Sequence, residues 1–422
     1  MPDPADLPAR ALIEALRAGR LTPRDVTEAC IARVAAREGT VRAFAAHDEA
    51  AWRRGAEVAP VESPLAGLPV GVKDVLDAAG LPAGYGSPIW EGWRPRADAA
   101  CVAMIRRAGG VVAGKTVTTE FATRRPGPTT NPHDPSRTPG GSSQGSAAGV
   151  AAGFFPLAYG TQTAGSIIRP AAYCGVVGFK PTYGTIHRGG MRVMSESLDT
   201  IGAMARDVFG CALLVGASAG LDLWSGLGRR AEPPRIAFIP GPAEDVLEES
   251  SRAMLEDLAA RLGRAGGRVE RVALPPAVLA AIEAHPVVMQ GEIRQALAWE
   301  HAAAPDGLSP WLRERAAWVD ALPDDALPRA REAFAKARTE FDAFMRDYDF
   351  VLTASAPGEA PSGLEATGDP ACNLLWTALH APCVTLPAGV GPHGMPLGVQ
   401  VVGAIGRDRA ILAAAEWVAG QV

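Results

Sequence analysis

Two short turns rich in serine and glycine carry the residues of this sequence that are best suited to covalent chemistry. The first turn spans residues 140–146 (Gly-Gly-Ser-Ser-Gln-Gly-Ser), and the second spans residues 161–166 (Thr-Gln-Thr-Ala-Gly-Ser). Small side chains in such turns let backbone amides approach a reacting atom closely. A serine hydroxyl becomes a good nucleophile only when a neighbouring group accepts its proton. The turns therefore predict acyl chemistry at a serine, with a base nearby.

A lysine is the expected base. The sequence has 41 basic residues, of which only four are lysines: Lys73, Lys115, Lys180 and Lys336. Arginine keeps its proton in proteins, whereas a buried lysine can have a pKa low enough to be partly neutral near pH 7. Lys73 and Asp74 end an apolar segment, residues 67–74, that reads as a short buried strand. The residues alone indicate a serine–lysine hydrolase without ranking the serines, and a structural Lys73–Asp74 ion pair is the alternative.

Two familiar motifs occur out of their usual context. Residues 109–116 have the spacing of a P-loop, but the middle of the would-be loop reads as a strand, so nucleotide binding is a remote alternative. The pattern Gly141-x-Ser143-x-Gly145 matches the nucleophile elbow of α/β-hydrolases. That motif follows a strand, which the prolines at 132, 135 and 139 exclude here. The seven histidines belong to no motif with the serines, so a serine–histidine–aspartate enzyme is a minor alternative.

The rest of the chain supplies the elements that must position the turns. The N-terminal segment 1–60 reads as helices, one of which starts at Thr22-Pro23 with an N-cap threonine and a first-turn proline. Strand and helix patterns then alternate, which predicts an α/β fold. From residue 276 to residue 346 helices dominate, and we expect this variable segment to line the substrate pocket. Strand patterns lie at residues 111–113, 157–160, 235–240, 268–275, 349–354, 384–387 and 398–402, and helix patterns at 24–37, 47–58, 98–108, 147–155, 207–219, 243–263 and 408–419.

Composition narrows the functional class. The net charge is −5 with both signs spread along the chain, so we expect no nucleic-acid partner. No apolar run reaches the ~18 residues of a membrane span, and the N-terminus lacks the apolar centre of a signal peptide, so we expect a cytoplasmic protein away from membranes. The six cysteines lie far apart without a C-x-x-C pair, which favours reduced thiols over disulfides or a zinc site. A small-molecule substrate and no metal or other cofactor are expected.

Three separated segments resemble the amidase signature family. Residues 67–82, 140–148 and 160–181 match the family's motifs in order, and the likeness extends from Leu16 to residues 396–402. The resemblance implies one compact α/β domain over residues 1–422, with a large mixed β-sheet covered by helices on both faces. Within it, residues 61–220 form the signature core.

The resemblance also implies a catalytic triad of a lysine and two serines. On the matching positions these are Lys73, Ser143 and Ser166. Lys73 would accept a proton from Ser143, Ser143 would accept one from Ser166, and Ser166 would attack an amide carbonyl to form an acyl-enzyme. The backbone amides of Thr163, Ala164, Gly165 and Ser166 would form the oxyanion hole.

The sequence departs from the family pattern within both turns. Gln162 stands where the family usually has aspartate, Ala164 replaces a glycine, and Gln144 replaces a glycine in the first turn. Arg169 follows Ser166 by three residues instead of two, which looks like the branch acting on small acidic amides such as malonamate. We expect Arg169, Gln162 and Ser142 to contact substrate, with Arg169 facing a substrate carboxylate.

The expected activity is hydrolysis of a carboxamide C–N bond, with release of ammonia or an amine from a small amide. The alternative within the family is the glutamine-hydrolysing A-type subunit of a tRNA-dependent amidotransferase, which would act with partner subunits. The sequence leaves the oligomeric state open, a homodimer included.

Overall fold

In the described part of the chain, eleven strands form one mixed sheet. A computed structural model describes residues 2–228, 233–241 and 244–422. Neighbouring strands are parallel in the pairs β2/β3, β2/β4, β7/β8 and β7/β9 and antiparallel in the others. The predicted α/β fold with a large mixed sheet is confirmed. In sheet order the strands are β1 (Phe44–His47), β3 (Val111–Thr116), β2 (Pro69–Lys73), β4 (Leu157–Gln162), β6 (Thr200–Ala205), β5 (Val177–Lys180), β10 (Cys383–Val390), β11 (Pro396–Val402), β9 (Phe350–Ala354), β7 (Arg235–Phe238) and β8 (Arg268–Arg271).

Helices cover both faces of this sheet. Phe350 and Leu352 of β9 belong to one hydrophobic cluster with residues of α8 and α14, whereas Val351 belongs to another with residues of α9 and α12. Both faces are therefore buried, because successive side chains of a strand point to opposite sides. The α-helices are α1 (Ala9–Arg17), α2 (Pro23–Val41), α3 (Glu49–Val58), α4 (Ala100–Arg107), α5 (Gln144–Ala152), α6 (Ile168–Tyr173), α7 (Val208–Ala219), α8 (Glu249–Arg264), α9 (Pro276–Ala296), α10 (Ala298–Ala303), α11 (Pro310–Asp320), α12 (Ala326–Phe344), α13 (Leu374–Ala378) and α14 (Asp408–Ala419). Short 3-10 helices are η1 (Pro4–Asp6), η2 (Pro88–Trp90), η3 (Glu120–Ala122), η4 (Glu244–Val246) and η5 (Pro305–Gly307).

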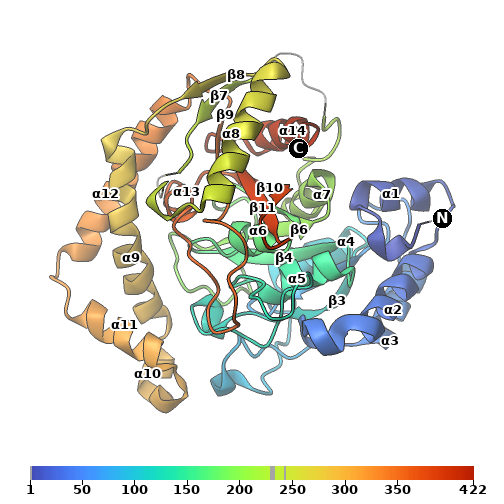
Figure 1. Ribbon diagram of the computed structural model, residues 1–422. Coiled ribbons are helices and arrows are strands. Elements are labelled where there is room, and N and C mark those ends of the chain that lie inside the picture. Colours follow the sequence, from blue (N-terminus) through green and yellow to red (C-terminus); the bar gives the residue numbers. More distant parts are fainter. Residues whose placement is uncertain (1, 229–232, 242–243) are drawn as a thin grey trace.

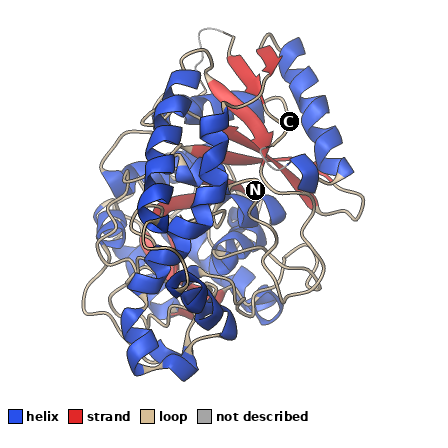
Figure 2. Ribbon diagram, turned by 90° about the vertical axis from the view of Figure 1, so that its left-hand side faces the viewer, coloured by secondary structure: helices blue, strands red, loops and turns tan. Residues whose placement is uncertain are grey.

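The helices α9–α12, which fall in the segment expected to be helical, form a separate layer beside the sheet. Figure 1 shows this layer on the side of the molecule opposite α1–α3. Seen from that side, long helices stand in front of the strands (Figure 2). None of the helices in the described ranges combines the length and apolar character that crossing a membrane requires.

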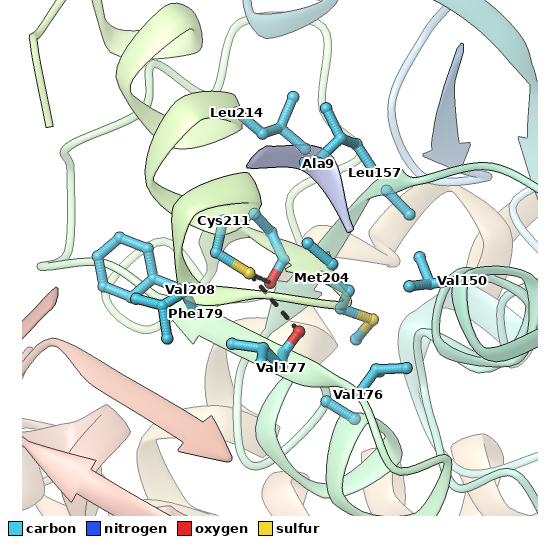
Figure 3. Packing of buried hydrophobic residues seen from close by; sticks show 14 of the residues in the cluster. Ala9, Val150, Leu157, Val176, Val177, Phe179, Met204, Val208, Cys211 and Leu214 are labelled. Atoms are coloured by element: carbon cyan, nitrogen blue, oxygen red, sulfur yellow. Dashed lines mark hydrogen bonds between the residues drawn. The ribbon is translucent and has the colours of Figure 1, made fainter. Parts of the chain in front are cut away.

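The interior near α7 illustrates the packing of the core. Figure 3 shows Val208 and Cys211 of α7 near Val177 of β5 and Met204 of β6. The Sγ atom of Cys211 lies 3.6 Å from the carbonyl oxygen of Val177, and burial raises the pKa of this thiol well above its usual range. The six cysteines are buried free thiols, as the sequence predicted.

The structure differs from the sequence-based expectations at three places. The helix expected from residue 47 begins at Glu49, because residues 44–47 form β1 and pair with the distant strand β3. The helix expected from residue 243 begins at Glu249, and residue 243 itself lies outside the described residues. Strand β3 continues through the whole of Val111–Thr116, with Lys115 completely buried, so these residues form no phosphate-binding loop and the nucleotide-binding alternative is wrong.

Candidate active site

The two serine turns meet at the end of strand β2. Lys73 is the last residue of β2, and Thr161 lies near the end of the parallel neighbour β4. The Nζ atom of Lys73 donates hydrogen bonds to Ser142 Oγ (2.6 Å), Thr161 Oγ1 (2.8 Å) and the Thr161 carbonyl oxygen (3.3 Å). Parallel strands bring their carboxyl ends to one edge of the sheet, which is how residues far apart in the sequence come into contact here.

The amine of Lys73 is shifted toward its neutral form. Its side chain is completely buried, and burial lowers the pKa of its amine to about 7, against a smaller opposing influence of the Asp199 charge. A substantial fraction of the amine is then neutral near pH 7. In that form its nitrogen lone pair can accept the proton of the Ser142 hydroxyl across the same 2.6 Å contact.

Ser142, not Ser143, contacts Lys73. The Oγ atom of Ser143 donates to the Thr161 carbonyl oxygen (3.3 Å) and accepts from the Thr161 backbone N–H (3.2 Å), so this hydroxyl is bound to the backbone of β4. The expected hydrogen bond between Lys73 and Ser143 is therefore wrong. Ser143 is the N-cap residue of α5, while the peptide bond between Gly141 and Ser142 is cis.

In the structure, Lys73 and Asp74 do not form the ion pair that the alternative reading predicts. Asp74 pairs with Lys115, whose Nζ atom lies 2.5 Å from Asp74 Oδ1, and not with Lys73. Both side chains are buried, and burial raises the pKa of Asp74. Lys115 and Asp74 thus form a buried ion pair of their own.

Gln162 stabilises the second turn from within. Its Oε1 atom accepts hydrogen bonds from the backbone N–H groups of Ile167 (2.8 Å) and Ile168 (3.1 Å), and its Nε2 atom donates to Thr377 Oγ1 (3.0 Å). The Thr377 hydroxyl in turn donates to the Ala164 carbonyl oxygen (2.7 Å). Gln162 is completely buried and does not line the cavity described below, so its expected contact with substrate is wrong; Ser142 is also buried, and its hydroxyl meets Lys73.

The start of the turn is held from two sides. Thr163 donates through Oγ1 to Asp199 (2.5 Å), and its carbonyl oxygen contacts Nε2 of His285 on α9 (3.0 Å). Asp199 also accepts from the backbone N–H groups of Met194 (2.7 Å) and Ser195 (3.1 Å). In the described chain, the backbone N–H groups of residues 163–166 donate to no protein acceptor. Ala164 does not adopt a positive φ, so its Cβ is compatible with this turn.

Ser166 faces a large cavity of about 1040 Å³. Its side chain lies just before α6, and within the described ranges its hydroxyl makes no hydrogen bond. Thr163, Ala164 and Arg169 also line the cavity. A free hydroxyl beside four unpaired backbone amides is the arrangement that acyl transfer requires.

Arg169 presents an unpaired cation to the same cavity. Its guanidinium donates to the Thr367 carbonyl oxygen (2.8 Å), the Gly141 carbonyl oxygen (2.9 Å) and Thr367 Oγ1 (3.3 Å). Its Nη1 atom is buried without a partner, and no carboxylate of the described residues pairs with it. Burial lowers the pKa of Arg169 to about 10, so the side chain remains charged at pH 7.

The other walls of the cavity come from α9, α11 and two loops. Helix α9 contributes Ile282, His285, Met289, Gln290 and Ile293, and burial lowers the pKa of His285 to about 4, which leaves it neutral at pH 7. The segment expected to line the pocket thus supplies part of the wall, although α12 does not reach it. Sequence patterns did not single out His285 or Gln290. The described residues contain no cluster of three or more metal-binding side chains.

Known proteins resemble this chain along nearly its whole length. Residues 25–412 match the family model described as Amidase. The A-type subunit of the glutamyl-tRNA(Gln) amidotransferase from Chloroflexus aggregans is 33% identical, over 92% of this chain and 91% of that protein. A crystal structure described as amidase has a TM-score of 0.89 at 30% identity, covering 99% of this chain and 100% of that one. The peptide amidase of Stenotrophomonas maltophilia has a TM-score of 0.82 at 28% identity, covering 98% and 96%.

Proposed function

The chain belongs to the amidase family and is an amide-hydrolysing enzyme, and from this premise we propose that it cleaves an acidic amide through an acyl-enzyme on Ser166. The proposed triad is Lys73, Ser142 and Ser166. The single observation that carries the assignment is the 2.6 Å contact between buried Lys73 and Ser142.

In this mechanism the proton moves in two steps as the new bond forms. Neutral Lys73 accepts a proton from Ser142, which accepts one from Ser166, while Ser166 Oγ attacks the amide carbon. The unpaired backbone amides of residues 163–166 bind the oxyanion of the tetrahedral intermediate. Ser142 then returns a proton to the departing nitrogen, so ammonia or an amine leaves neutral, and water hydrolyses the acyl-enzyme by the same relay.

We assign Arg169 to a carboxylate on the substrate. Its buried Nη1 atom has no partner among the described residues, and an unpaired buried donor destabilises the fold unless a ligand accepts its hydrogen bond. A carboxylate can accept two parallel hydrogen bonds from a guanidinium. Malonamate, a small amide with one carboxylate, is therefore our first test substrate.

Glutamine is the second candidate substrate. The relative from Chloroflexus aggregans, which belongs to an amidotransferase, matches over most of both chains and favours this function. Arg169 fits the carboxylate of glutamine as well, and Glu365 and Asp369 line the cavity where an ammonium group would need an acidic partner. In this case the chain would act with partner subunits.

Ammonia release from malonamate, glutamine and benzamide distinguishes these substrates. We expect release by the native protein and by a control with the surface replacement Ser225→Ala, and none by Ser166→Ala. Release from glutamine only in the presence of partner subunits would favour the second candidate. Equal release by the native and Ser166→Ala proteins would remove Ser166 as the nucleophile.

A further inference from the structure

The wall that α9 contributes to the cavity contains one polar side chain with an unexplained environment. Gln290 is only 4% exposed and lines the cavity together with the apolar residues Ile282, Met289 and Ile293. Its Oε1 atom is fully enclosed and has no hydrogen-bond partner in the part of the chain that the structure describes. A buried carbonyl oxygen without a partner destabilises a fold, whereas methionine would fill this position without that cost.

Gln290 shares this property with Arg169 alone among the described residues that line the cavity. Each is at least nine-tenths buried and keeps an enclosed polar atom unpaired, Nη1 in Arg169 and Oε1 in Gln290. The other charged side chains of the lining, such as Arg124 and Glu365, are exposed and can be satisfied by water. Arg169 offers donors and Gln290 offers an acceptor, so the pair would suit a ligand with an anion and an N–H group.

The position of Gln290 relative to the reacting centre follows from α9. His285 of the same helix contacts the carbonyl oxygen of Thr163, at the start of the second turn. Gln290 lies five residues further along, about 7.5 Å at the helical rise of 1.5 Å per residue. Arg169 belongs to α6 and is held by Gly141 and Thr367. The two unpaired groups thus reach the cavity from different elements.

We propose that Gln290 binds the leaving-group side of the substrate by accepting a hydrogen bond from a second N–H group, as in a carboxamide or ureide. The inference rests on the proposed function, because it takes Arg169 as the site of the carboxylate. The substrate class is then an N-substituted acid amide, with the carboxylate on one side of the scissile bond and a second amide on the other. Buried polar groups of this kind discriminate strongly against analogues that lack the matching hydrogen.

Binding to the Ser166→Ala protein, which cannot turn the ligands over, tests this inference. The probes are malonyl-glycinamide and malonyl-glycine methyl ester, which have similar shapes but differ in the terminal N–H group. Calorimetric titration should show that the amide binds about tenfold more tightly than the ester. Adding Gln290→Met should bring the ratio of the two affinities close to one, while Gln290→Glu, which keeps an acceptor, should preserve the preference.

Gln295→Met is the matched control, because Gln295 lies on the same helix but outside this cavity. It should leave the affinity ratio at its original value. An equal ratio in the Ser166→Ala and Ser166→Ala/Gln290→Met proteins would overturn the inference, and so would failure of the Ser166→Ala protein to bind either probe. If Gln290→Met does not fold, as judged by circular dichroism, Gln290→Leu serves in its place.

The same probes separate this inference from the proposed function. Suppose that the amide binds more tightly than the ester and that this preference depends on Gln290, but that the native protein releases no amine. The binding role of Gln290 would then stand, and hydrolysis of this substrate class would be refuted. Turnover of both probes at equal kcat/KM would refute the role of Gln290 and leave the acyl-enzyme mechanism standing.

Discussion

Replacing Ser142 by alanine should disconnect the base from the nucleophile. Ser142 Oγ is the hydroxyl in contact with Lys73, at 2.6 Å, and Ser143 Oγ is bound to the backbone of Thr161. The two serines are adjacent in the sequence and equally buried, so Ser142→Ala and Ser143→Ala remove the same atom from neighbouring positions. They form a matched pair: Ser142→Ala removes the contact with Lys73, and Ser143→Ala removes the hydrogen bonds to Thr161.

The two variants are expected to lose different amounts of activity and stability. Loss of a positioned acid–base group typically costs 10² to 10⁴ in rate, so we expect Ser142→Ala to lower kcat/KM by about 10³, or about 4 kcal/mol of activation free energy. Ser143→Ala removes two hydrogen bonds of 3.2 and 3.3 Å to one peptide. We expect it to reduce the free energy of unfolding by about 1–2 kcal/mol and kcat/KM by less than about tenfold.

The assay is steady-state ammonia release with the best substrate of the panel, together with urea unfolding of each variant. Thermal unfolding and circular dichroism show whether each protein is folded at the assay temperature. If Ser143→Ala lost as much activity as Ser142→Ala while remaining folded, the relay through Ser142 would be refuted and Ser143 would regain the role that the sequence pattern suggested.

Three further results are expected. The kcat/KM should rise with pH through about 7 as Lys73 becomes neutral. Asp199→Asn should move this rise to lower pH, because it removes a negative charge that favours the ammonium form of Lys73. A profile that is flat between pH 6 and 8 would argue against Lys73 as the base. Arg169→Leu should abolish the preference for malonamate over malonamide, at a cost of about 10- to 100-fold in kcat/KM for malonamate, and an unchanged preference would remove its carboxylate-binding role. Lys115→Met should lower the free energy of unfolding by about 3–5 kcal/mol because it leaves Asp74 buried without its ion-pair partner. In urea unfolding, the double variant Lys115→Met/Asp74→Leu should recover most of this loss. Equal stability of the single variant and the native protein would contradict the prediction.

The few lysines of the sequence are mostly buried, but only one of them belongs to the proposed catalytic triad. Lys73, Lys115 and Lys180 are all completely buried, whereas Lys336 is exposed. Lys115 pairs with Asp74, and Lys180 donates to the carbonyl oxygens of Ala381 and Pro181. Burial lowers the pKa of Lys180 as it does that of Lys73. What separates Lys73 is its contact with a serine hydroxyl.

Local patterns were sufficient to predict the fold class and the region of the site. The apolar run ending at Lys73 became β2, and the small-residue turns became the connections around α5 and before α6. Such features depend on side-chain size, turn chemistry and periodicity within a few residues, which a single sequence displays. The short strand β1 was missed because its pairing with β3 is a long-range contact.

Only the tertiary structure decided which side chains meet. Ser142 and Ser143 have the same type and nearly the same position, and the choice between them depends on how the first turn faces a lysine 69 positions away. Gln162 was expected to contact substrate, but its hydrogen bond to Thr377, 215 positions away, holds it inside the turn. Gln290 lies on α9 without any motif, and its unpaired oxygen becomes apparent only where α9 closes the cavity beside Ser166. Spacing along a chain determines local conformation, whereas hydrogen-bond partners and burial depend on segments that the fold brings together.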